Sequence, residues 1–139
     1  MGYFDVFNEV FQQVKTVLAG IGDLKQVVLG EQFKLANLPL AIINPVGSTF
    51  TQFSLGQTLQ NTVEFDIIIL IRETEPENWF SNIVLPMCSV VDAILADRTL
   101  NGKVKDCIPA SFEPSQIRMV NKLYYGGVIR FKALLYYSP

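Results

Sequence analysis

The feature that most constrains the fold is a strand-like run over residues 63–72, which leads into a long helical pattern ending at Asn101 and Gly102. Because side chains alternate along a strand, one face of this run is apolar throughout, while the other face is apolar only at Ile68 and Leu70. A strand that needs cover on both faces at its centre lies inside a sheet rather than at its rim. The pattern therefore predicts a central strand followed by a helix.

The remaining segments show the period of either a helix or a strand. Apolar residues at helical spacing predict an N-terminal helix over residues 4–21, and residues 74–77 have the form of a capping box for the second helix. Pro86 predicts a kink in that helix, because proline removes a backbone hydrogen bond. Strand patterns cover residues 26–30, 38–45, 104–108, 116–121 and 128–137. Before the last of these, Gly126 and Gly127 are typical of a tight turn or bulge.

This order of elements predicts an α+β fold in one domain that spans residues 1–139. We expect a single mixed or antiparallel sheet of four to six strands, with two main helices packed mainly on one face. Only 17% of the residues are charged, below the roughly 25% of an average soluble domain. Two helices leave the opposite sheet face with little cover, so the chain is expected to bury that face by forming oligomers.

No charged residue occurs between Lys34 and Glu64, and within this interval residues 44–61 are rich in Gly, Ser, Thr, Gln and Asn. The same segment carries Phe50, Phe53 and Leu55. An uncharged loop with aromatic residues suits a surface that orders against a partner, since interface cores are depleted in charge. The alternative is a hairpin tip folded onto its own domain, and the sequence leaves both readings open.

Charge is distributed unevenly along the chain. Residues 1–97 hold eleven acidic and four basic residues, whereas residues 98–139 hold two acidic and seven basic ones. The basic residues that align on the C-terminal strands are Arg118, Lys122, Arg130 and Lys132. They predict an interface with the acidic part of a neighbouring subunit or a nucleic-acid stripe, against the simpler reading that the charges neutralise one another within one subunit. The pI near 5.0 argues against nucleic-acid binding as the main activity.

Motifs that carry catalysis or bind cofactors are missing from the sequence. It has no histidine, no glycine-rich phosphate loop and no metal-ligand spacing, and Cys88 and Cys107 read as small buried hydrophobes. We therefore predict no cofactor, no metal and no enzymatic activity. Glu64 and Asp66, two apart on one strand face, are the carboxylates available to an enzyme, and they read more simply as solvated residues at a sheet end.

The sequence also bears on where the protein resides. Its longest wholly apolar run, residues 67–71, is far shorter than the roughly 20 residues that span a bilayer. The N-terminus lacks the basic region of a signal peptide. We therefore expect an intracellular soluble protein with no membrane partner.

Taken together, the elements resemble the tail terminator, or tail-to-head joining, proteins of long-tailed bacteriophages and related viruses. The features that carry the resemblance are the N-terminal helix, the strand over residues 38–45, the long strand over 63–72, the helix ending in residues 97–102, and the closing strand after residues 125–127. The resemblance covers nearly the whole chain as a pattern of elements with short motifs.

The resemblance implies a structural protein of the virion that assembles in the host cytoplasm. Members of this family form a ring, typically a hexamer, on the head-proximal end of the tail tube, stop tube growth and dock the tail to the head connector, with DNA free to pass through the lumen without specific binding. They are not enzymes. A head-completion or connector adaptor protein is the alternative within virus assembly, and a small-ligand-binding domain or an enzyme using Glu64 and Asp66 is the alternative from another class.

Overall fold

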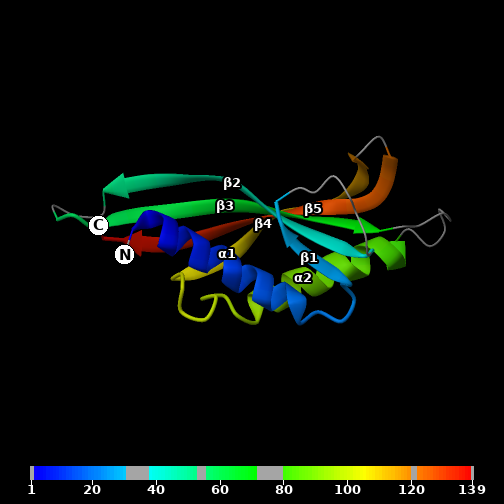
Figure 1. The fold of residues 1–139 in the computed structure, drawn as a ribbon, viewed down its shortest axis with the longest axis horizontal. Coiled ribbons are helices and arrows are strands. Elements are labelled where there is room, and N and C mark those ends of the chain that lie inside the picture. The colour runs from blue at the N-terminus through cyan, green and yellow to red at the C-terminus, as the bar shows by residue number, and fades with distance from the viewer. Residues whose placement is uncertain (1, 31–37, 53–55, 72–79, 120–121, 139) are drawn as a thin grey trace.

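The computed structural model describes residues 2–30, 38–52, 56–71, 80–119 and 122–138, without the side chains of residues 80 and 115–124. Its elements, in chain order, are α1 (Tyr3–Ala19), β1 (Gln26–Leu29), β2 (Leu40–Gln52), β3 (Leu59–Ile71), η2 (Phe80–Val84), α2 (Leu85–Leu95), β4 (Asp106–Met119) and β5 (Lys122–Tyr137). The strands form one sheet in the order β1-β2-β3-β5-β4 (Figure 1). β1 and β2 run parallel, and all other neighbours run antiparallel. The predicted α+β fold with one mixed sheet is confirmed.

The main core lies between the sheet and its two helices, which pack on the same face (Figure 1). β3 is the middle strand, as its two-sided apolar pattern predicts, and its residues Phe65, Ile67 and Ile69 are fully buried against that core. α1 contributes Phe11 and Val14 from one stripe, because residues three and four apart share a helix face. A chain of ring contacts runs from α1 into the sheet, with the Phe65 and Phe131 rings stacked at 5.5 Å.

The opposite sheet face divides into two parts. Near β1 it buries a second, smaller apolar cluster, made of Val28, Leu40, Ile42 and Leu70. Further along, on β3 and β5, it carries charged side chains that stay partly accessible to solvent. The expectation of an uncovered face therefore applies to the β3–β5 part and not to the β1–β2 part.

The second helix is shorter than its sequence pattern suggests. It opens with a π-helical segment, η2, and changes to α-helix at Leu85, immediately before the predicted interruption at Pro86. It ends at Leu95 instead of at Asn101 and Gly102, which is a correction. Leu100, Asn101 and Gly102 all have positive φ angles, so this segment is a left-handed turn and cannot extend the helix. The predicted capping box at residues 74–77 lies outside the described residues.

The last third contains two long strands and not the three predicted. β4 and β5 form one antiparallel hairpin, in which Pro109 and Pro114 lie within β4 at the edge of the sheet. Proline is tolerated there because an edge strand need not donate on its outer side. Gly126 lies inside β5 and not in the turn that the sequence predicts. Glycine is needed there because a Cβ atom would collide with the carbonyl oxygen of Ile69. The two prolines therefore mark the edge of the sheet, and Gly126 marks a close approach between the backbones of β5 and β3.

Candidate assembly interfaces

Two ion pairs join β3 and β5 on the sheet face that the helices leave uncovered. Asp66 stands directly opposite Arg130, and the guanidinium donates two hydrogen bonds to the carboxylate, at 2.8 and 3.1 Å. One step along the same face, Glu64 stands opposite Lys132, with 3.7 Å between the carboxylate oxygen and Nζ. The Arg130 pKa is raised above its ordinary value, first by the hydrogen bonds to Asp66 and then by the charge of that carboxylate.

This pairing changes the interpretation of the four residues. The basic side chains predicted to meet another subunit and the carboxylates considered for an enzyme neutralise each other within one chain. The simpler reading of the charge asymmetry thus describes Arg130 and Lys132. Arg118 and Lys122 occupy β4 and β5 at the far end of the hairpin, and their side chains lie outside the described residues.

Residues 44–52 of β2 and 59–66 of β3 pair as a hairpin, called the arm below, at the end of the molecule where both chain termini lie (Figure 1). Much of the segment 44–61 is therefore part of a hairpin, the second of the two readings that the sequence left open. Phe50 lies on the helix-covered side of the arm, where its ring meets that of Tyr3 at 5.1 Å, and it stays 47% exposed. Phe53 and Leu55 lie outside the described residues. The structure does not bring Phe50 together with Arg130 and Lys132, which project from the opposite face.

The N-terminus of α1 anchors this arm through polar contacts. The Tyr3 hydroxyl donates to Oδ1 of Asn61 at 2.9 Å and lies 3.1 Å from the Ser48 hydroxyl. Asn61 is fully buried, and its amide group donates to the Thr49 carbonyl at 3.0 Å. Every buried polar atom of Asn61 thereby has a partner, which fixes the two strands of the arm relative to α1.

Among the described residues, β2 has a long edge that no other strand covers, called the free edge below. β1 pairs only with residues 40–43 of β2, so no other described strand lies beside residues 44–52 on that side. Those nine residues include no charged side chain, and Val46 and Phe50 on them are nearly half exposed. Natural edge strands are usually protected by charges or prolines, and here only Pro45 and the bulge beside it serve this purpose. The missing charge is visible in the sequence, whereas its position on the outer edge of the sheet is visible only in the structure.

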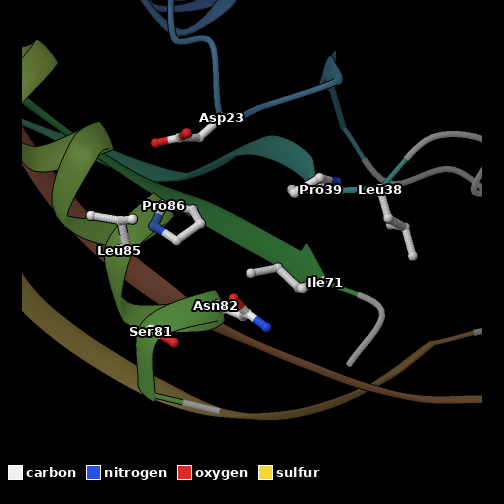
Figure 2. A pocket seen from close by; sticks show the side chains of 8 residues that line it. All are labelled: Asp23, Leu38, Pro39, Ile71, Ser81, Asn82, Leu85 and Pro86. Atoms are coloured by element: carbon white, nitrogen blue, oxygen red, sulfur yellow. The ribbon is translucent and has the colours of Figure 1, made fainter. Parts of the chain in front are cut away.

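A pocket opens at the other end of β2 and β3 (Figure 2). It measures about 320 Å³ and has an apolar floor with polar groups at its rim. Its lining residues are Asp23, Leu38, Pro39, Ile71, Ser81, Asn82, Leu85 and Pro86. The Asp23 carboxylate accepts a hydrogen bond from the Ser89 hydroxyl at 3.1 Å, and Leu85 projects into solvent at the rim. This volume is at the lower end for a small-molecule site.

The two cysteines lie in different environments. Cys107 is buried against the main core, and burial raises the pKa of its thiol to about 12. Cys88 is exposed on α2, which corrects the expectation that both are buried. Within the described residues, no group of three or more Cys, Asp or Glu side chains could hold a metal ion.

Across the described part of the chain, no helix is long and apolar enough to cross a membrane.

No protein-family model matches the sequence, and no curated protein matches it.

Proposed function

We propose that this chain is a structural assembly protein of the tail terminator class. It forms a ring of six copies on the head-proximal end of a phage tail tube, stops tube polymerisation and docks the tail to the head connector. In this role it acts through shape and surface complementarity within the virion, needs no cofactor, and lets DNA pass through the ring.

The observation that supports this proposal most is that the helices cover only one face of the sheet and leave one strand edge exposed. Both helices pack on one face, and the arm of β2 and β3 carries an uncharged strand edge with exposed Val46 and Phe50. A cyclic ring needs two different surfaces that complement each other, and a subunit with chemically distinct edges offers them. The order of elements that resembles the tail terminator family adds to this argument.

The proposal is tested with the purified protein alone. Multi-angle light scattering and negative-stain electron microscopy should find closed rings, and the rings should bind to tube ends and stop elongation when added to polymerising tube protein of the same virus. Rings that bind the head connector and leave tube growth unchanged would favour the head-completion alternative. A strict monomer at all concentrations would overturn both.

The pocket beside Asp23 supports one alternative function from another class, the binding of a small ligand. A small-ligand-binding domain would use its apolar floor and polar rim, and Leu85 at its mouth would contact the ligand. In that case a metabolite screen by thermal shift should raise the melting temperature, and Leu85→Lys should abolish the effect. The enzyme alternative would have to act through Glu64 and Asp66, both of which are held in ion pairs.

A further inference from the structure

The sheet has a second long edge, on β4, that differs from the free edge of β2. Its two prolines, Pro109 and Pro114, have no N–H group, and a bulge falls between Pro109 and Ser111. Two β4 edges therefore cannot complete a hydrogen-bonded ladder with each other. Proline keeps its carbonyl oxygen, however, so β4 can still accept hydrogen bonds from a strand that has donors. Residues 46–52 of β2 have no proline and can supply them.

The directions of the strands suit such a pair. β2 is antiparallel to β3, β3 to β5, and β5 to β4, so β2 and β4 run in opposite directions. If a second copy is placed beside the first with its sheet facing the same way, its β4 lies antiparallel to β2. Antiparallel pairing is the slightly more stable arrangement per residue.

The side chains of the two edges also match. Residues 44–52 of β2 and residues 107–112 of β4 are uncharged, so bringing them together desolvates no charge. Each edge exposes large apolar side chains, Val46 and Phe50 on one and Ile108 and Phe112 on the other. The register places Phe50 and Phe112 on the helix-covered side of the sheet, where aromatic residues on adjacent strands stabilise pairing.

We infer that a second copy of this chain adds its β4 strand to the free edge of β2. This inference rests on the proposed ring and names the surfaces that join its subunits. The contact is heterologous, because one copy uses β2 and the next uses β4, and each subunit keeps one unused edge for a further copy. Such contacts continue until the rotation closes them into a ring.

Cysteine cross-linking tests the inference. In a Cys88→Ser background, Thr49→Cys marks the β2 edge and Ala110→Cys marks the β4 edge, both at exposed positions. A short bismaleimide reagent tolerates small differences of register. Covalent dimers are expected when the two single variants are mixed and not with either alone, and the double variant should give a ladder of covalent oligomers that ends at the ring.

The other results each overturn something definite. Dimers from the Thr49→Cys variant alone would mean that two β2 edges pair with each other. Rings seen by electron microscopy without any cross-link would overturn the inference and leave the proposed function intact. A strict monomer would overturn both.

A charge placed on the edge gives a second readout. Thr49→Lys with Thr51→Lys should raise the concentration needed for ring formation by at least about tenfold, because lysine on an edge strand opposes strand addition. The matched control is Gln12→Lys with Ala19→Lys on the exposed face of α1, which should leave that concentration unchanged. An equal response of both variants would contradict the β2 assignment.

Discussion

The hydroxyl of Tyr3, in the first turn of α1, donates a hydrogen bond to the fully buried side chain of Asn61 on β3, across 58 residues of sequence. The side-chain amide of Asn61 in turn donates a hydrogen bond to the Thr49 carbonyl of β2. The start of the chain thereby holds both strands of the arm, and stability of the arm depends on α1.

Removing these bonds should lower the free energy of unfolding by graded amounts. Tyr3→Phe keeps the ring contacts and loses the hydroxyl, so we expect a loss of about 1 kcal/mol. Asn61→Ala leaves the Thr49 carbonyl without this donor and should lose about 2 kcal/mol. Urea denaturation followed by circular dichroism measures both. An Asn61→Ala variant as stable as the parent would show that the bonds do not hold the arm.

Gly126 should tolerate no side chain. Its backbone passes so close to Ile69 that a Cβ atom would meet a carbonyl oxygen of the central strand, and neither backbone can yield without breaking sheet pairing. Gly126→Ala should therefore lower the free energy of unfolding by at least about 2 kcal/mol. Gly47→Ala is the matched control, since nothing lies within 4 Å of the added atom, and it should change stability by less than about 0.5 kcal/mol.

The pair of Asp66 and Arg130 should survive an exchange of its members. Asp66→Arg or Arg130→Asp alone places like charges opposite each other on adjacent strands and should lower the urea midpoint of unfolding. The double variant restores opposite charges and should recover most of the loss. If the ring instead needs Arg130 to meet a neighbouring subunit, the double variant will be stable and will fail to assemble, which light scattering will reveal.

The two thiols should react very differently. At pH 8 a thiol reagent should label the exposed Cys88 of the native protein within minutes. Cys107 should resist labelling, because it is buried and its pKa of about 12 keeps the reactive thiolate scarce. Mass spectrometry after labelling identifies the modified residue, and Cys88→Ser should remove native labelling. Rapid modification of Cys107 without denaturant would contradict its placement in the core.

Acid should selectively weaken the link between Arg98 and Asp106. The Arg98 side chain donates two hydrogen bonds to the Asp106 carboxylate. These bonds lower the pKa of Asp106 below its ordinary value of 3.8. A carboxyl whose folded pKa is depressed stabilises the protein above its unfolded pKa and loses this effect as the pH falls through the folded value. The difference in unfolding midpoint between the parent and Asp106→Asn should thus be constant above about pH 5 and vanish in strong acid.

Several elements follow from sequence because they depend on local periodicity. The central position of β3 comes from apolar residues on both of its faces, and the stripe that includes Phe11 and Val14 identifies α1. The switch near Pro86 also follows from a single residue, because a missing N–H group acts locally.

Other features depend on which strands become neighbours, which no local pattern contains. Pro109 and Pro114 fall between the predicted strands 104–108 and 116–121, and β4 can run through both because it lies at the edge of the sheet. The ion pair of Asp66 and Arg130 joins residues 64 apart, and it requires the register of β3 and β5. The free edge of β2 depends on how far β1 extends, so the candidate interface could be recognised only in three dimensions.

β1 stops after four residues, while its neighbour β2 continues for thirteen. Residues 44–52 of β2 therefore have no strand partner on their outer side among the described residues. A β1 strand longer by nine residues would reach the end of β2 and pair the outward amides there. If the proposed ring uses this edge, an insertion before Gly30 that lengthens β1 should stop a subunit from accepting its neighbour.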